Sequence, residues 1–293
     1  MNVFDQLAEL GHEQVVLCSE PEVGYRGIIA IHSTALGPAV GGTRWWTYRS
    51  DEEAITDALR LSRGMSFKNA LARLPLGGGK SVILGGPGQQ DRAAILRAHG
   101  RAINRLAGMY ITAEDVGTSP ADMEHIAETT RFVAGRAGTS GDPSPHTARG
   151  VFRAMQAAAQ VRWGSDSLEG KTVALQGCGN VGYHLALELK RAGATILASD
   201  IDETKVERVV SETGATRVAP DRIHAAKADV FAPCALGAVL HDQSIPELQV
   251  EVICGGANNQ LLEPRHGRMV TDRGILYVPD YVANAGGVTF RGS

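Results

Sequence analysis

The sequence predicts an α/β protein of two domains, and three observations support this. The chain has 293 residues, which exceeds the roughly 100–200 residues typical of one domain. After residue 147, short apolar strand patterns alternate with amphipathic helix patterns, which predicts a parallel sheet with right-handed crossovers. A G-x-G-x-x-G motif at residues 177–182 lies between a strand and a helix, as in Rossmann-type dinucleotide-binding domains.

The composition excludes several classes of protein. With 43% hydrophobic and 21% charged residues, the chain can bury a core. A net charge of −3 gives no basic field for nucleic acid, and no apolar run approaches the length of a membrane span. The N-terminus carries no secretory signal, and cysteines 18, 178, 234 and 254 have no metal-ligand or CxxC spacing. We therefore expect a cytoplasmic protein that binds no metal, nucleic acid or membrane.

The N-terminal part combines strands and helices. Apolar, β-branched runs predict three strands, at residues 13–19, 25–32 and 40–46. Two glycines in the third run indicate close approach of another backbone. Ser50 as N-cap, Glu53 at N3 and the apolar spacing predict a helix over residues 51–63.

Further elements complete this part of the chain. A glycine-rich turn at 77–79 is expected to lead into a strand over 80–84. A helix over 91–106 and a short strand over 109–113 follow, and Ser119-Pro120 opens another helix with serine as N-cap and proline at N1. Three glycines and two prolines in residues 135–145 indicate a linker. We place the domain boundary there, between residues 140 and 141.

The second domain alternates strands with helices. Helices are expected at residues 147–162, 180–191 and 203–212. Strands are expected at residues 171–176, 195–199, 230–232 and 250–254. This order predicts a doubly wound parallel sheet.

The dinucleotide motif has six residues, and each of its three glycines has a defined role. It consists of Gly177, Cys178, Gly179, Asn180, Val181 and Gly182. The first glycine permits a tight turn, the second lets the backbone approach a pyrophosphate, and the third lets the helix pack on the strand. Asp200 ends the next strand, where a carboxylate binds ribose hydroxyls and repels a 2′-phosphate, which favours NAD over NADP. The alternatives are a glycine-rich turn without a ligand and a solvated acid at position 200.

Lysine usage identifies a second candidate site. The chain has six lysines against 23 arginines, and the first 170 residues contain only Lys68 and Lys80. Two nearby ammonium groups in apolar surroundings would lower each other's pKa, so that one could act as a base while the other holds a carboxylate. Asp115 follows a strand, where parallel-sheet proteins often place functional groups. The alternatives are two surface lysines, a helix-capping Asp115, and a P-loop at GGGKS. The P-loop lacks its first glycine, since position 74 is Leu.

These residues lie in stretches that resemble the glutamate/leucine/phenylalanine/valine dehydrogenases. The matching stretches are LGPAVGGTRWWTY, DALRLSRGMSFKNALARLPLGGGKSVI, YITAEDVGTSPADM, GDPSPHTARGV, LEGKTVALQGCGNVGYH, DVFAPCALGA, CGGANNQL and PDYVANAGGV. They spread over nearly the whole chain, and GGGK, AEDVG and NAGG in this order are highly specific. Leucine dehydrogenases are the most similar branch.

The resemblance implies NAD-dependent, reversible oxidative deamination of an L-amino acid to a 2-oxo acid and ammonia. It implies that Lys80 activates the water that attacks the imine, that Lys68 binds the substrate carboxylate, and that Asp115 exchanges a proton with the amino group. The remaining site residues are the substrate contacts Gly41, Val40, Ala113, Asn258 and Val288, and the nicotinamide contacts Thr147 and Asn284. The N-terminal domain, residues 1–140, would bind substrate and form a homo-oligomer, and residues 141–293 would bind NAD.

The resemblance also leaves alternatives open. The aliphatic pocket candidates offer no partner for a side-chain carboxylate, so a branched-chain, leucine-like substrate is expected rather than glutamate, with valine and phenylalanine as rivals. The family continues past NAGGV with helices that are expected to be absent from this chain, which ends at Ser293. A weakly active, truncated NAD-binding homologue is therefore the alternative function.

Overall fold

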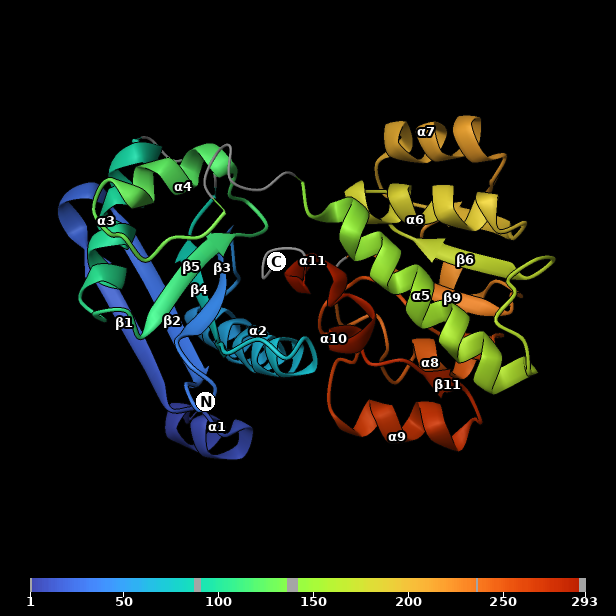
Figure 1. The fold of residues 1–293 in the computed structure, drawn as a ribbon, viewed down its shortest axis with the longest axis horizontal. Helices are drawn as coiled ribbons and strands as arrows, with labels where there is room; N and C mark the ends of the chain where they lie inside the picture. The colour runs from blue at the N-terminus through green and yellow to red at the C-terminus, as the bar shows by residue number, and fades with distance from the viewer. Residues whose placement is uncertain (1, 87–90, 136–141, 236, 290–293) are drawn as a thin grey trace. The chain divides into compact units, whose positions relative to one another are not determined.

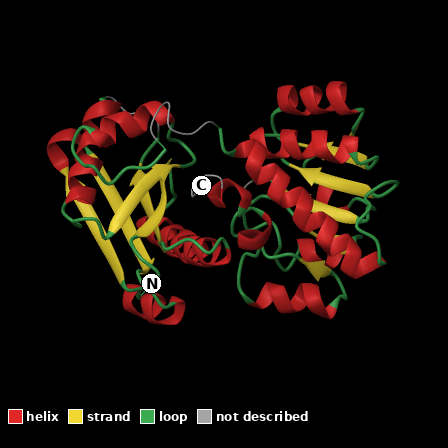
Figure 2. Ribbon diagram, in the orientation of Figure 1, coloured by secondary structure: helices red, strands yellow, loops and turns green. Residues whose placement is uncertain are grey.

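The chain forms two compact units, Met1–Gly141 and Asp142–Ser293. The computed structural model describes residues 2–86, 91–135, 142–235 and 237–289. The domain boundary expected between residues 140 and 141 lies outside the described residues. Both units are α/β (Figures 1 and 2), so the predicted fold class is confirmed.

The first unit contains a mixed sheet of five strands in the order β1-β2-β4-β3-β5. The strands are β1 Gln14–Glu20, β2 Tyr25–Ser33, β3 Ala39–Trp46, β4 Gly77–Leu84 and β5 Tyr110–Glu114. β2 runs antiparallel to β1 and β4, whereas β3 runs parallel to β4 and β5. β3, β4 and β5 therefore bring their carboxyl ends to one edge of the sheet, where polar groups can gather.

Helices cover both faces of this sheet (Figure 1). They are α1 Val3–Leu10, α2 Asp51–Leu71, α3 Arg92–Asn104 and α4 Pro120–Ala127. α2 packs on Ile28, Ala30 and Val82. α3 and α4 pack on the opposite face, against the side chains of Ile29, Trp45 and Ile83. Because side chains alternate along a strand, Lys80 shares the face of Val82, beneath α2, and Ser81 shares the face of Ile83.

Two sequence predictions for this unit were wrong in extent. The helix predicted over 51–63 continues through Gly64 to Leu71 and carries Lys68. The space around Gly64 is open, so its helix cost of about 1 kcal/mol relative to alanine is offset by the buried face of α2. Residues 77–79 form the start of β4 rather than a turn. A Cβ on Gly78 would lie 2.2 Å from the Ser66 backbone nitrogen, so close packing on α2 requires glycine there.

The second unit is a parallel sheet in the order β11-β10-β9-β6-β7-β8. The strands are β6 Thr172–Gln176, β7 Thr195–Ser199, β8 Thr216–Arg217, β9 Val230–Pro233, β10 Val252–Ile253 and β11 Leu276–Tyr277. The order reverses between β6 and β9, which is the switch point at which doubly wound folds bind ligands. The doubly wound prediction is confirmed, and the two-residue strands β8 and β11 were too short to predict from the sequence.

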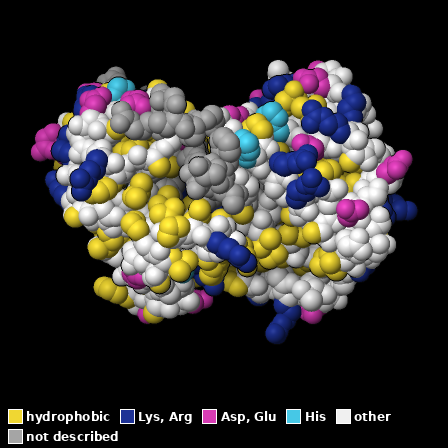
Figure 3. Space-filling model, in the orientation of Figure 1, with side chains coloured by type: hydrophobic (Ala, Val, Ile, Leu, Met, Phe, Trp, Pro, Cys, Tyr) yellow, Lys and Arg dark blue, Asp and Glu magenta, His cyan; other side chains and the backbone are white. Residues whose placement is uncertain are grey.

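Helices also cover both faces of the second sheet (Figures 1 and 2). They are α5 Ser144–Trp163, α6 Asn180–Arg191, α7 Glu203–Thr213, α8 Ser244–Glu247, α9 Arg265–Asp272, α10 Asp280–Ala283 and α11 Gly286–Thr289. Charged side chains of both signs are spread over the face in Figure 3. Among the described residues, no helix is long and apolar enough to span a membrane.

The cap of α4 gives a test of the local fold. The Ser119 hydroxyl accepts the Asp122 backbone N–H, and the Asp122 carboxylate accepts the Ser119 N–H at 2.8 Å. We expect Ser119→Ala to lower the free energy of unfolding by about 1 kcal/mol, because one helix N–H loses its acceptor. Urea denaturation followed by circular dichroism measures this. Ser211→Ala, on the exposed face of α7, should change stability by less than about 0.5 kcal/mol, and equal effects of both variants would contradict the capping role.

Candidate active site

Lys80 and Asp115 form a buried ion pair. Lys80 lies in the middle of β4 and is 4% exposed, and Asp115 directly follows β5. The Lys80 Nζ lies 2.8 Å from the Asp115 Oδ2. The sequence proposed both residues as catalytic, and the structure brings them into direct contact.

Arg44 and Asp57 extend this pair into a network that sequence reasoning missed. The Arg44 Nε lies 3.0 Å from the same Asp115 Oδ2, and its Nη1 lies 2.8 Å from the Asp57 Oδ2. The Tyr48 hydroxyl donates a hydrogen bond of 2.6 Å to that Asp57 oxygen. A usable signal was present, since Arg44 is a charged residue inside a strand pattern that alternates with the buried Thr43 and Trp45.

Burial dominates the electrostatics of Lys80. Burial lowers the pKa of Lys80, the Asp115 carboxylate opposes this, and the Arg44 guanidinium lowers the pKa further. The effect of Arg44 has a geometric reason, because Arg44 and Lys80 approach the same Asp115 carboxylate oxygen. The expected influence of Lys68 on Lys80 stays a prediction.

Asp115 is held as a carboxylate. Burial by itself would raise its pKa, but the attraction of Lys80 and Arg44 outweighs burial and holds the pKa of Asp115 well below its usual range. The Asp115 backbone N–H donates to the Thr118 hydroxyl at 3.0 Å, which fixes the turn after β5. The network therefore presents an ionised acid beside a lysine that can release its proton more easily than an exposed lysine.

Glycines make room for this arrangement. A Cβ on Gly42 would lie 2.6 Å from the Glu114 carbonyl oxygen and 2.7 Å from the Asp115 Cβ. A Cβ on Gly41 would lie 1.7 Å from the Gly79 carbonyl oxygen. Strand packing thus explains both glycines, and the expected approach of Gly41 to a substrate stays a prediction.

The other substrate candidates of this unit lie on the same side of the sheet as Lys80. β3 pairs with β4 and β5 so that Val40 lies opposite Gly78 and Gly42 lies opposite Ala113. Val40 is half-buried and Ala113 is buried. Lys68 is half-buried on α2, the helix that covers this face.

The glycine loop of the second unit has the geometry of an anion site. Gly177 has φ +98°, and a Cβ on Gly182 would lie 1.9 Å from the Gly177 carbonyl oxygen. Gly179 caps α6, and nothing lies within 4 Å of the position of its Cβ. Asn180 is exposed and Val181 half-buried in the first turn of α6. The loop thus leaves open space at a helix N-terminus, where free N–H groups favour an anion.

Asp200 is attached to this loop. Its Oδ2 accepts the Cys178 N–H at 2.7 Å, and its Oδ1 accepts the Asp202 N–H at 2.9 Å. A carboxylate offers about four acceptor positions, so Asp200 can also accept ribose hydroxyls.

Thr147, Asn258 and Asn284 also belong to the second unit. The Asn284 Nδ2 donates to the Asn258 Oδ1 at 2.7 Å. The Asn284 Oδ1 is buried without a hydrogen-bond partner among the described residues. The Thr147 hydroxyl donates to the Pro143 carbonyl at 3.1 Å and lies 2.5 Å from where Gly287 would carry a Cβ. The unpaired oxygen can accept an amide donor, while the Val288 side chain lies outside the described part.

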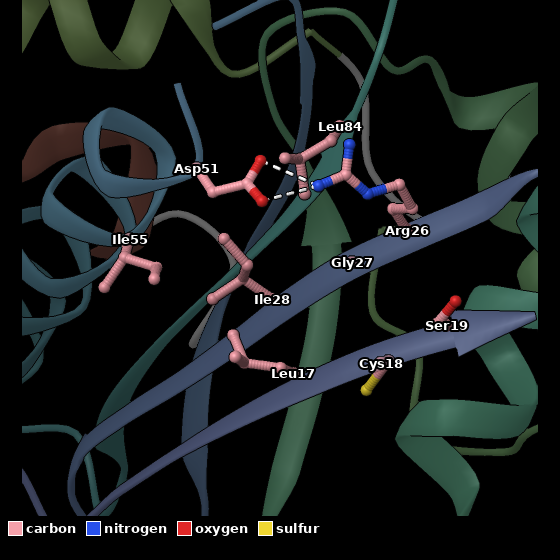
Figure 4. Close-up of a pocket in the computed structure, with 9 residues that line it drawn as sticks. All are labelled: Leu17, Cys18, Ser19, Arg26, Gly27, Ile28, Asp51, Ile55 and Leu84. Atoms are coloured by element: carbon pink, nitrogen blue, oxygen red, sulfur yellow. Dashed lines mark hydrogen bonds and ion pairs between the residues drawn. The ribbon is translucent and has the colours of Figure 1, made fainter. Parts of the chain in front are cut away.

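The first unit also has a hollow that is lined by other residues and, among those the structure describes, contains no buried ion pair like that of Lys80 and Asp115. Figure 4 shows it, with the Arg26–Asp51 ion pair at its rim. The residues lining it are Leu17, Cys18, Ser19, Arg26, Gly27, Ile28, Asp51, Ile55 and Leu84. Both partners of the ion pair are more than half exposed, so the pair resembles ordinary surface charge. Among the described residues, no cluster of His, Cys, Asp or Glu could hold a metal ion.

Comparisons with known proteins identify a family for both units. A family model described as "Glu/Leu/Phe/Val dehydrogenase, dimerisation domain" matches residues 12–132. The model "Glutamate/Leucine/Phenylalanine/Valine dehydrogenase" matches residues 138–204 and 195–292.

Individual relatives match over nearly the whole chain. A leucine dehydrogenase of Geobacillus stearothermophilus is 54% identical over 98% of this chain and 79% of its own length. A valine dehydrogenase of Streptomyces virginiae is 49% identical over 95% of this chain and 79% of its own length. The crystal structure of L-tryptophan dehydrogenase from Nostoc punctiforme has a TM-score of 0.78 and 45% identity, and the match covers 97% of this chain and 82% of that one.

The depressed pKa of Asp115 predicts a pH-dependent stability. Since the folded pKa lies below the value of about 3.9 of an unfolded aspartate, ionised Asp115 contributes stability above about pH 4. This contribution is lost as the pH falls through the folded pKa. We expect Asp115→Asn to lower the free energy of unfolding by about 2–4 kcal/mol at pH 7. The gap to wild type should begin to narrow below about pH 4 and keep narrowing as the pH falls toward the folded pKa of Asp115.

Urea denaturation at several pH values measures this gap. Asp51→Asn is the matched control, because it removes one partner of the exposed pair with Arg26. It should cost less than about 1 kcal/mol. A gap for Asp115→Asn that stays constant with pH would show that the ion pair does not hold Asp115 ionised.

Proposed function

Because this chain belongs to the glutamate/leucine/phenylalanine/valine dehydrogenase family, we propose that it deaminates a leucine-like, branched-chain aliphatic L-amino acid with NAD. The reaction is a reversible oxidative deamination that gives the 2-oxo acid and ammonia, and the chain is an amino-acid dehydrogenase. The single observation that carries the proposal is the buried Lys80–Asp115 pair. It places a proton donor and a proton acceptor together inside a sheet.

Each residue of the first unit has a defined role in this proposal. The Lys68 ammonium binds the substrate carboxylate. The Asp115 carboxylate accepts a proton from the substrate amino group, which becomes the neutral amine required for oxidation. Loss of hydride from the α-carbon converts the amine to an imine. The neutral Lys80 then takes a proton from water as the water oxygen bonds to the imine carbon. The lowered pKa of Lys80 supports this use as a base near neutral pH.

The second unit fits a dinucleotide. Bound NAD supplies the hydride acceptor. Gly177 to Gly182 would hold its pyrophosphate at the N-terminus of α6, and Asp200 would hold its ribose and disfavour NADP. The unpaired Asn284 Oδ1 is suited to accept the amide N–H of nicotinamide. The resemblance adds Thr147 as a second nicotinamide contact and Asn258 as a substrate contact.

The side-chain pocket favours an aliphatic substrate. Val40 and Ala113 lie on the Lys80 face of the sheet, and the resemblance adds Val288 and the backbone of Gly41. None of these side chains can pair with a substrate carboxylate, which argues against glutamate. Apolar pockets separate neighbouring aliphatic side chains by only about 10–200-fold, so valine is the expected second substrate.

The first unit is also proposed to form a homo-oligomer. The family model that matches residues 12–132 is described as a dimerisation domain. All four cysteines are free, which fits a reducing, cytoplasmic location. Gel filtration with light scattering measures the assembly, and a monomer would contradict this part of the proposal.

The substrate proposal predicts a ranking of turnover. We expect NADH formation with Leu, Ile and Val, at least about tenfold higher kcat/KM for Leu than for Phe, and little activity with Glu or with NADP. Steady-state absorbance at 340 nm measures this.

Lys80→Met should reduce kcat by at least about 100-fold, because the base is removed. A preference for Glu would contradict the pocket argument, and NAD binding without turnover of any amino acid would favour a weakly active NAD-binding homologue.

The glycine loop predicts a separable effect on cofactor binding. Since nothing lies within 4 Å of a Cβ on Gly179, Gly179→Ala should fold with wild-type stability. It should nevertheless weaken NAD binding at least about tenfold, because the methyl group occupies the place of the pyrophosphate. Isothermal titration calorimetry gives the Kd. Gly64→Ala inside α2 is the matched control for a glycine with open surroundings and no positive φ, and it should leave the Kd unchanged. An unchanged Kd in Gly179→Ala would refute the pyrophosphate position.

A further inference from the structure

Arg44 connects helix α2 to the Lys80–Asp115 pair. Its guanidinium bonds to two carboxylates at once, through Nε to Asp115 at 3.0 Å and through Nη1 to Asp57 at 2.8 Å. The Arg44 side chain is 16% exposed, so both contacts form largely out of water. A planar guanidinium with a fixed fork of donors can bridge two acids in this way, whereas a lysine ammonium on a flexible stem cannot hold the same geometry.

Asp57 is itself fixed. It lies in α2, whose first turn is capped by Ser50. Its Oδ2 accepts the Tyr48 hydroxyl at 2.6 Å in addition to Arg44. The carboxylate that anchors Arg44 is therefore held by a helix and by a second hydrogen bond.

The contacts of the Asp115 side chain all reach one oxygen. Lys80 and Arg44 both approach Oδ2, and within the described residues no hydrogen bond reaches Oδ1. The Asp115 backbone is held separately, by the Thr118 hydroxyl at 3.0 Å. Arg44 is therefore not needed to form the turn, and its contact fixes the orientation of the carboxylate.

We propose that Arg44, anchored by Asp57, is the positioning residue of this site. It holds the Asp115 Oδ2 against Lys80 and leaves Oδ1 to accept the proton of the substrate amino group. The inference rests on the proposed function, because that proton transfer belongs to the deamination. Arg44 acts through Asp115 and does not touch the substrate.

The same geometry makes Arg44 a fixed positive charge beside Lys80. The charged groups that act on Lys80 are Asp115 after β5, Arg44 on β3 and Asp57 on α2. Arg44 lowers the pKa of Lys80, and Asp57 raises it. Loss of the Arg44 charge should therefore move the acid limb of the kcat/KM profile to higher pH, and loss of the Asp57 charge should move it to lower pH.

Four variants test the positioning role. Arg44→Met should reduce kcat about 100-fold, as expected for a misplaced catalytic group. It should leave KM for the amino acid within about threefold and raise the acid limb by about one pH unit. Arg44→Lys should keep the limb near its wild-type position but still lose kcat, because lysine cannot bridge both acids. Asp57→Asn should lose kcat and shift the limb downward. Arg26→Met removes an exposed arginine of the same sheet and should match wild type.

Two kinetic outcomes would overturn the inference. The first is that Arg44→Met keeps a kcat within about twofold of wild type and an acid limb of the kcat/KM pH profile at the wild-type position. The second is a rise in KM alone, which would make Arg44 a substrate ligand. If Arg44→Met fails to fold, Arg44→Lys and Asp57→Asn test the role in its place. The same shift of the acid limb of the kcat/KM pH profile in both variants would overturn the positioning role.

A measurement without turnover separates this inference from the proposed function. The chain has six lysines, so [ε-¹³C]lysine labelling gives few NMR signals, and Lys80→Met identifies the Lys80 signal. The titration midpoint of that signal should be higher in Arg44→Met than in wild type and lower in Asp57→Asn. Unchanged midpoints would overturn the inference, whatever the activity. Shifted midpoints in a protein that turns over no amino acid would support the Arg44 coupling and refute the proposed function.

Discussion

Burial of the Lys80 ammonium is the constraint on which the first unit depends. An isolated charge inside a sheet costs several kcal/mol of desolvation, and Asp115 offsets this cost at 2.8 Å. Asp115 would be costly to bury as well, and Arg44 completes its pairing. Gly42 is required because a Cβ there would meet Asp115. Asp115, Arg44 and Gly42 are thus explained by one requirement, which is to pair a charged amine that is buried away from water.

The opposite face of the same strands carries a buried, uncharged polar network among its apolar side chains. Ser81 follows Lys80 and hydrogen-bonds with the buried His99 and Thr43 at 3.0 Å and 2.8 Å. Burial lowers the pKa of His99 to about 3, so the ring stays uncharged near neutral pH. The Tyr110 hydroxyl adds a hydrogen bond of 2.6 Å to the Gly41 carbonyl oxygen. This satisfied network holds the backbone that carries Lys80 without placing a second charge beneath it.

The second unit places its polar groups at the switch point of its sheet. Gly177 directly follows β6 there, and a Cβ on it would lie 2.7 Å from the backbone nitrogen of Ala235, just after β9. Asp200, at the end of β7, joins the loop through the Cys178 N–H. The loop is therefore fixed by backbone packing on one side and by a carboxylate on the other. It keeps its open side at Gly179 for an anion.

The sequence by itself determined the fold class, the glycine loop with Asp200, and Lys80 with Asp115, because these depend on local patterns and on residue types that fit one chemistry. It did not reveal that residues 77–79 belong to β4 or that α2 continues to Lys68, since glycine favours a turn unless tertiary packing requires it. Arg44 and Asp57 also escaped the sequence. They lie 13 residues apart on a strand and a helix, and Asp115 lies 71 residues beyond Arg44. Only the packing of α2 on the sheet brings the three together, and only burial makes their charges strong enough to shift the pKa of Lys80.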